Sequence, residues 1–153
     1  NIKLIKSLSP YLIVSFSAPV IFRDTLLNIP THGCINLHCS LLPEYSGVMP
    51  SFWVLFKNEK YTGATIHYMD DKIDNGKIIA QKKIDISEDE TILSIVKKTK
   101  IIGGKLMIDV IRKLKSDKSD LLLIDNKVDN KKYYSWPTLS EMKLFSKRGG
   151  KLI

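Results

Sequence analysis

Short apolar runs alternate in this chain with stretches whose hydrophobic residues recur at helical spacing. The apolar runs, each bounded by Gly, Pro or polar residues, predict strands over residues 11–17, 34–38, 62–68 and 77–84. Residues 20–28 and 51–57 have the composition of short helices, and residues 121–124 are a candidate for a last strand. Strands that alternate with helices indicate an α/β domain whose sheet is mostly parallel and flanked by helices.

The longest helix is expected after a capping box, in which Ser87 is followed at the i+3 position by Glu90. From there apolar residues keep helical spacing as far as Leu114, which predicts one long amphipathic helix. Gly103 and Gly104 lie inside this helix, and each costs roughly 1 kcal/mol relative to alanine. A close packing contact at this point of the helix is one explanation for the pair.

The C-terminal part of the chain carries a second helix signal. Thr138 and Glu141 form a capping box, and the glycines at 149–150 provide the expected stop. A polar stretch separates this region from the long helix. We therefore expect a core over residues 1–115 and a C-terminal extension with a terminal helix over residues 116–153.

Composition and charge exclude several classes of protein. The chain has 153 residues, 44% hydrophobic and 26% charged, as in one globular domain, and no run of about 20 apolar residues that could cross a membrane. Its net charge of +8 favours an acidic partner such as nucleic acid, or reflects lysines spread over solvated faces. The lysines are scattered without interleaved aromatic residues, which favours the second interpretation. Two cysteines, Cys34 and Cys39, make no disulfide framework, and a cytoplasmic location is expected.

A polar pair lies on the apolar strand predicted over residues 34–38. Side chains in a strand alternate between faces, so Asn36 and His38 share one face while Ile35 and Leu37 share the other. Buried polar groups of this kind are either satisfied by hydrogen bonds or functional. The pair is therefore a core Asn-His pair bonded to neighbouring backbone, or part of a site at the carboxyl end of the strand, where α/β sheets bind ligands.

Further motifs follow this strand in a fixed order. After Asn36-Leu37-His38 come Ser-Leu-Leu-Pro-Glu-Tyr-Ser-Gly at 40–47, Thr-Gly-Ala-Thr-Ile-His at 62–67 and Asp-Asn-Gly at 74–76. Together these motifs resemble the folate-dependent formyltransferases, a family that includes glycinamide ribonucleotide, methionyl-tRNA and amino-sugar formyltransferases. The resemblance implies a Rossmann-like domain, of which this chain is the C-terminal part, and transfer of a formyl group from 10-formyltetrahydrofolate to a primary amine.

The resemblance implies a catalytic trio of Asn36, His38 and Asp74. Asn36 would donate an amide N–H to the formyl oxygen as negative charge develops there. His38 would handle the proton exchanged between the amine and the folate nitrogen, and Asp74 would orient or charge-balance His38. In some family members a histidine at the position of His67 lies near the site, so His67 is an accessory candidate. The alternative is a satisfied histidine at a strand end.

The resemblance also implies a pocket for the pteridine ring of the folate. One wall is expected from the segment around the end of the first strand, and the other from the acidic loop that precedes the strand at 77–84. The candidate pocket residues are Phe16, Ala18, Pro19, Val20, Met69, Asp70, Asp71 and Ile73.

No metal is expected in this site. A calcium loop that began at Asp71 would place Ile73 and Lys82 at ligand positions, and neither side chain binds calcium. The three histidines of the chain lack the spacing of a zinc site. Cys39 is not expected to act as a nucleophile with His38, because neighbouring side chains in a strand point apart.

The chain departs from the family pattern at both ends. Family members carry an N-terminal βαβ portion before the segment that matches Ile2, and this chain opens with Asn1, so we expect a truncated or processed product. Methionyl-tRNA formyltransferases carry an extra C-terminal domain, whereas residues 133–153 are similar to tails of formyltransferase-like proteins, some of which act on nucleotide-linked amino sugars. A small molecule or a nucleotide-linked amino sugar is therefore the favoured acceptor.

Three alternatives stay open. The acceptor could be methionyl-tRNA, and for a formyltransferase nucleic acid would be a partner only in that case; the net charge of +8 fits it. The chain could be a non-catalytic remnant that binds folate, although drift would be expected to remove at least one member of the trio. The charge could serve RNA binding, which the lack of interleaved basic and aromatic residues disfavours.

Overall fold

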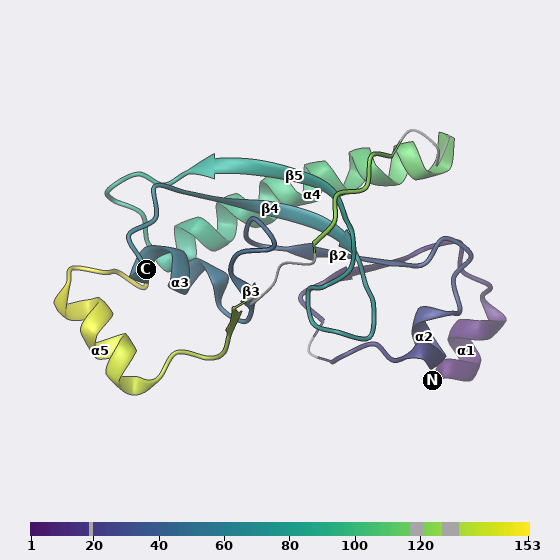
Figure 1. The fold of residues 1–153 in the computed structure, drawn as a ribbon, viewed down its shortest axis with the longest axis horizontal. Coiled ribbons are helices and arrows are strands. Elements are labelled where there is room, and N and C mark those ends of the chain that lie inside the picture. The colour runs from purple at the N-terminus through teal and green to yellow at the C-terminus, as the bar shows by residue number, and fades with distance from the viewer. Residues whose placement is uncertain (19, 117–120, 127–131) are drawn as a thin grey trace.

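The computed structural model describes residues 1–18, 20–116, 121–126 and 132–153 of the chain. Its centre is a four-stranded sheet in the order β1-β2-β4-β5 (Figure 1). The strands are β1 Ile13–Phe16, β2 Cys34–His38, β4 Tyr61–Tyr68 and β5 Ile78–Asp85. All four were predicted from the sequence, and β2 has the predicted bounds.

The prediction of a mostly parallel sheet is confirmed only in part, because the sheet is mixed. β1 and β2 pair in parallel, with Ser15 opposite Asn36 in the register, whereas β2–β4 and β4–β5 pair antiparallel. β4 and β5 are joined by a hairpin loop over residues 69–77, and a hairpin connection makes its two strands antiparallel. Apolar runs in a sequence show where strands lie and do not show their direction.

One long helix, α4 Ile92–Ser116, packs against the sheet and runs along β4 and β5 in Figure 1. The main core is formed by residues of the sheet and of this helix: Ile35, Leu37, Ala64, Ile66, Ile79, Met107, Val110 and Leu114. Because Ile35 and Leu37 point into this core, Asn36 and His38 lie on the opposite face of β2.

The predicted capping box of α4 is wrong. The helix begins at Ile92 and is capped by a later pair, in which the Ser94 N–H donates to Thr91 Oγ1 at 3.0 Å and the Thr91 N–H donates to Ser94 Oγ at 2.8 Å. Ser87 Oγ instead donates to Glu90 Oε1 at 3.1 Å in the turn before the helix. Both pairs have the i, i+3 spacing of a capping box, so spacing alone does not distinguish them.

The two glycines of α4 have different surroundings. A methyl group added at Gly103 would lie 2.4 Å from Leu37 Cδ1 in the core, whereas one added at Gly104 would meet no atom within 4 Å. Gly103 therefore allows close packing of α4 on β2, which is the explanation that the sequence suggested for one glycine of the pair.

This difference gives a matched test of the packing. We expect Gly103→Ala to destabilise the protein by about 1–3 kcal/mol through overpacking. Gly104→Ala should stabilise it by about 1 kcal/mol, because alanine is the better helix former. Urea unfolding of the two variants measures both changes, and a stabilised Gly103→Ala variant would contradict the contact with Leu37.

The C-terminal extension returns to the sheet as a short strand. β6 Tyr133–Tyr134 pairs in parallel with β3 Ser46–Gly47, a short strand at the end of the motif at 40–47 that was not predicted. Residues 121–124 do not form the predicted strand, and within them Ile124 alone pairs, through a bridge with Ile78. The extension therefore pairs at two places, with Ile78 at the start of β5 and with β3.

The terminal helix α5 Leu139–Lys147 has the predicted capping box of Thr138 and Glu141, and Gly149 follows it with φ +85°. It packs with the helix α3 Pro50–Phe56, which was also predicted, and with the start of α4. The second hydrophobic cluster consists of Phe52, Trp53, Ile92 and Phe145.

The N-terminal helices are short. α1 Ile2–Ser7 lies where no element was predicted, and the helix predicted over residues 20–28 is reduced to the single turn α2 Asp24–Leu27. Residues 20–22 have no regular secondary structure, and they line the pocket at the candidate site. No helix among the described residues has the length and apolar character needed to span a membrane.

Candidate functional site

Four polar side chains from β2, β4 and the hairpin loop come together. Asn36 and His38 lie on β2, His67 lies on β4 opposite Asn36, and Asp74 lies in the loop. The Asp74 carboxylate lies between the histidines, with Oδ2 3.4 Å from His38 Nδ1 and Oδ1 3.7 Å from His67 Nε2. The structure thus brings the three predicted catalytic residues and the accessory candidate His67 into one cluster.

His38 makes a contact through each ring nitrogen. Its Nε2 lies 2.9 Å from the carbonyl oxygen of Tyr45, and because a carbonyl can only accept, Nε2 carries a proton. Its Nδ1 faces the Asp74 carboxylate at 3.4 Å. A proton on Nδ1 makes this contact an ion pair, and the His38 side chain is only 7% exposed, so solvent screens it little. The pair can therefore hold an exchangeable proton.

His67 is oriented the other way. Its Nδ1 donates to the Tyr68 carbonyl oxygen at 2.7 Å, so in the neutral ring Nε2 is an acceptor. The Asn36 amide Nδ2 donates to that Nε2 at 3.3 Å. A second N–H remains on the same amide nitrogen, and Asn36 lines the pocket. His67 therefore orients an amide that can offer an N–H to a ligand.

Asp74 is held in an unusual backbone conformation. Its φ is +48°, in the left-handed region that residues with a side chain seldom adopt. The Gly47 N–H donates to its carboxylate Oδ2 at 2.8 Å, and the Asn126 side chain donates to its carbonyl oxygen at 2.8 Å. The loop is thus held from β3 and from the C-terminal extension.

The motif at 62–67 fixes the loop that carries Tyr45. Thr65 Oγ1 donates to the Ser40 carbonyl oxygen at 2.6 Å and accepts from the Leu42 N–H at 3.1 Å. These bonds tie the segment after β2 to the neighbouring strand β4. Thr65 therefore holds the segment whose Tyr45 carbonyl oxygen accepts a hydrogen bond from His38 Nε2.

The cluster borders a pocket of about 630 Å³. Asn36, His67 and Asp74 line it, whereas His38 is 6% exposed, contacts Asp74 and is not a lining residue. The predicted pocket residues that line it are Ala18, Val20, Met69, Asp70 and Ile73. Residues from both segments that were expected to form the walls therefore line this pocket, and their role in binding a pteridine ring stays a prediction.

Three predicted pocket residues have a different outcome. Phe16 does not line the pocket: its neighbour Ser15 does, and alternation along β1 turns Phe16 to the other face, where it is 54% exposed. Asp71 lies in an exposed bend of the loop and is not a lining residue either. Pro19 falls outside the described residues.

The contribution of the C-terminal extension was missed at the sequence level. Tyr133 and Trp136 line the pocket because β6 pairs with β3. Gly47 permits this pairing, since its φ is +110° and a Cβ there would lie 2.2 Å from the Tyr134 carbonyl oxygen. The sequence shows a group of aromatic residues at 133–136, but it does not indicate the strand with which they pair.

Burial keeps neighbouring ionisable groups neutral. Tyr45 Oη donates to Glu59 Oε1 at 2.5 Å, and burial together with this carboxylate raises the pKa of Tyr45 above its ordinary value. Burial also raises the pKa of the Cys39 thiol, which disfavours the thiolate that a nucleophile needs. Among the described residues, no three His, Cys, Asp or Glu side chains are placed to hold a metal ion. A metal-free site stays a prediction.

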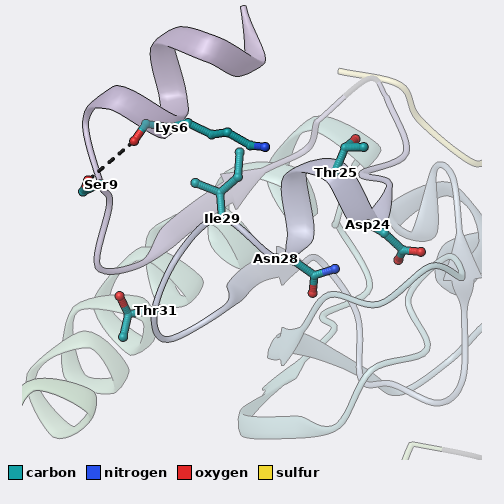
Figure 2. Close-up of a pocket in the computed structure, with 7 residues that line it drawn as sticks. All are labelled: Lys6, Ser9, Asp24, Thr25, Asn28, Ile29 and Thr31. Atoms are coloured by element: carbon teal, nitrogen blue, oxygen red, sulfur yellow. Dashed lines mark hydrogen bonds between the residues drawn. The ribbon is translucent and has the colours of Figure 1, made fainter.

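A second hollow of about 480 Å³ lies by the N-terminal helices (Figure 2). It is lined by Lys6, Ser9, Asp24, Thr25, Asn28, Ile29 and Thr31. Figure 2 shows these side chains, and the Ser9 hydroxyl donates to the Lys6 carbonyl oxygen at 3.5 Å. None of its lining residues belongs to the four motifs or the polar cluster, so the pocket at Asn36 and Asp74 is the candidate site.

Comparisons with known proteins agree with this geometry. A family model described as formyl transferase matches residues 1–111. A methionyl-tRNA formyltransferase from Thermodesulfovibrio yellowstonii is 40% identical over 114 residues, which cover 74% of this chain and 37% of the relative. The structure of a sugar N-formyltransferase from a Shewanella species aligns with a TM-score of 0.73 and 26% identity, over 94% of this chain and 55% of that one.

Some of the solved relatives carry ligands. The N-formyltransferase from Helicobacter canadensis, in complex with folinic acid and dTDP-3-aminofucose, aligns with a TM-score of 0.61 and 27% identity, over 67% of this chain and 37% of that one. This chain spans little more than a third of the length of the curated relative from Thermodesulfovibrio, namely 37%. The family match over residues 1–111 includes every residue of the polar cluster. The chain belongs to the formyl transferase family, as its motifs indicated.

Proposed function

We propose that the protein transfers a formyl group from 10-formyltetrahydrofolate to a primary amine in the pocket lined by Asn36 and Asp74. The observation that carries the proposal is the connected cluster in which an amide N–H donor lies beside a carboxylate–imidazole pair. Acyl transfer to an amine needs a donor at the acyl oxygen and a group that takes the amine proton. Asn36 supplies the first, and Asp74 with His38 supplies the second.

The pocket fits a folate as formyl donor. Its volume of about 630 Å³ lies within the range of roughly 300–1,000 Å³ that is usual for small-ligand pockets. Ala18, Val20 and Met69 offer apolar walls for a flat ring, and Asp70 adds polar groups. The folinic acid in the Helicobacter relative supports the same class of ligand for this chain.

The proposed reaction uses the cluster as follows. The amine nitrogen attacks the formyl carbon, and a C–N bond forms as the bond from that carbon to folate N10 breaks. The Asn36 N–H that is not bonded to His67 stabilises the charge on the formyl oxygen. Asp74, beside His38 Nδ1, accepts the proton that the amine loses and returns it to N10, which gives a formamide and tetrahydrofolate.

We propose a nucleotide-linked amino sugar as the acceptor. Tyr133 and Trp136 line the pocket and remain 52% and 68% exposed, so their rings are available to stack on a nucleobase. Lys72 also lines the pocket and can pair with a phosphate. The likeness to the Shewanella sugar N-formyltransferase extends over 94% of this chain. A cytoplasmic location remains part of the proposal.

An acceptor panel tests this assignment. Formylation of UDP- and dTDP-linked amino sugars by this chain is compared with formylation of methionyl-tRNA, all with 10-formyltetrahydrofolate. We expect the sugars to be formylated and Trp136→Ala to raise their KM about 5- to 100-fold through lost stacking. Trp136→Phe, which keeps a flat ring, is the control and should change KM much less. Formylation confined to methionyl-tRNA would select the alternative acceptor, and folate binding without any transfer would indicate a remnant.

A further inference from the structure

A buried asparagine of the C-terminal extension holds the loop that carries Asp74. Asn126 is 0% exposed, and its Nδ2 donates to the carbonyl oxygens of Asp74 at 2.8 Å and of Gly76 at 3.0 Å. One side-chain amide thus binds two carbonyls of the same turn, which uses both of its N–H groups. The bond to Asp74 joins residues 52 positions apart in the sequence.

The turn that Asn126 binds needs outside support. Asp74 has φ +48°, and left-handed backbone is disfavoured for a residue with a side chain. Gly76 lies tightly against β4, where a Cβ would be 2.0 Å from the Tyr68 carbonyl oxygen. Ile124 bridges to Ile78 through two backbone hydrogen bonds of 2.9 Å, which brings the backbone of the extension beside the turn.

The position of this turn decides where the Asp74 carboxylate lies. Oδ2 receives the Gly47 N–H at 2.8 Å and faces His38 Nδ1 at 3.4 Å, while Oδ1 faces His67 Nε2 at 3.7 Å. All three contacts are made while Asp74 holds a left-handed backbone conformation. A relaxed turn would move the carboxylate away from its partners.

We propose that Asn126 is a positioning residue that keeps the Asp74 carboxylate between His38 and His67. The effect of Asn126 on turnover rests on the proposed function, whereas its effect on the position of the Asp74 carboxylate does not. The Gly47 N–H reports that place directly, because its hydrogen bond is made to the Asp74 carboxylate.

The test compares three variants of this chain. Asn126→Asp keeps the shape and replaces the donors with acceptor oxygens, Asn126→Ser keeps a single donor, and Leu122→Ala is a control in the same segment at a residue that is 90% exposed. Hydrogen exchange of the Gly47 amide is followed by NMR, with amides of β4 as the reference for global unfolding. Formyl transfer is measured in parallel.

We expect Gly47 exchange in Asn126→Asp to rise about tenfold while β4 exchange is unchanged, because a bond to a charged acceptor is lost. Turnover should fall about 10²-fold with a KM for the folate within about threefold, as for a misplaced reacting group. Leu122→Ala should change neither quantity. If Asn126→Asp does not fold, Asn126→Ser is expected to show smaller changes in the same direction.

Unchanged Gly47 exchange in a folded Asn126 variant would overturn the positioning role, whatever happens to turnover. A parent chain without formyl transfer, combined with the expected change at Gly47, would overturn the proposed function and uphold the placement of Asp74 by Asn126.

Discussion

Replacing His38 with alanine is expected to lower turnover about 10²- to 10⁴-fold, as the loss of acid–base help does in other enzymes. The imidazole faces the Asp74 carboxylate at 3.4 Å and donates to the Tyr45 carbonyl at 2.9 Å. Without it, Asp74 loses its imidazole partner at the point where it takes the amine proton. The measurement is kcat for formyl transfer, with circular dichroism to confirm that the variant is folded.

A second histidine provides the matched control. His32 stacks on Tyr11 with ring centroids 3.8 Å apart and does not line the pocket. We expect His32→Ala to keep the kcat of the parent, whatever small loss of stability it shows. Near-normal turnover in a folded His38→Ala protein would contradict the role of His38 in the proton transfer.

Replacing Asn36 with alanine should lower kcat about 10²- to 10³-fold, the usual cost of removing one donor to a developing oxyanion. The amide is held by His67 Nε2 at 3.3 Å, which fixes its orientation, and Asn36 lines the pocket. The variant loses a hydrogen bond that forms only in the transition state. We therefore expect kcat and kcat/KM to fall together while KM changes little. Steady-state kinetics of the folded variant measures the three quantities.

An asparagine away from the pocket is the control for this variant. Asn28 lines the second hollow and contributes nothing to the polar cluster, so Asn28→Ala should leave kcat unchanged. A folded Asn36→Ala protein that loses only substrate affinity, with kcat preserved, would show that Asn36 binds substrate and does not stabilise the reaction.

The polar cluster could be predicted from the sequence because its members lie in short local motifs. Asn36 and His38 share a face of β2 by alternation alone, and the strand bounds were predicted correctly. Asp74 belongs to a loop between two predicted strands, and the hairpin returns it to the sheet. The family resemblance joined these pieces, and the family match confirmed it.

The remaining features depend on contacts that a local pattern does not contain. Strand direction follows from how β4 and β5 are connected, and the cap of α4 depended on a choice between two motifs of equal spacing. Tyr133, Trp136 and Asn126 reach the site only because the C-terminal extension pairs with β3 and with Ile78. Side chains brought in by such long-range pairing leave no periodic signal around them.

The most direct test of the account is calorimetry of this chain with a stable analogue of 10-formyltetrahydrofolate, beside an Asp74→Ala control. Asp74 lines the pocket, and its carboxylate ties the loop over residues 69–77 to Gly47. We expect saturable binding by the parent chain and weaker binding by the Asp74→Ala control. A well-folded parent chain that binds no analogue would contradict the claim that this pocket holds the formyl donor.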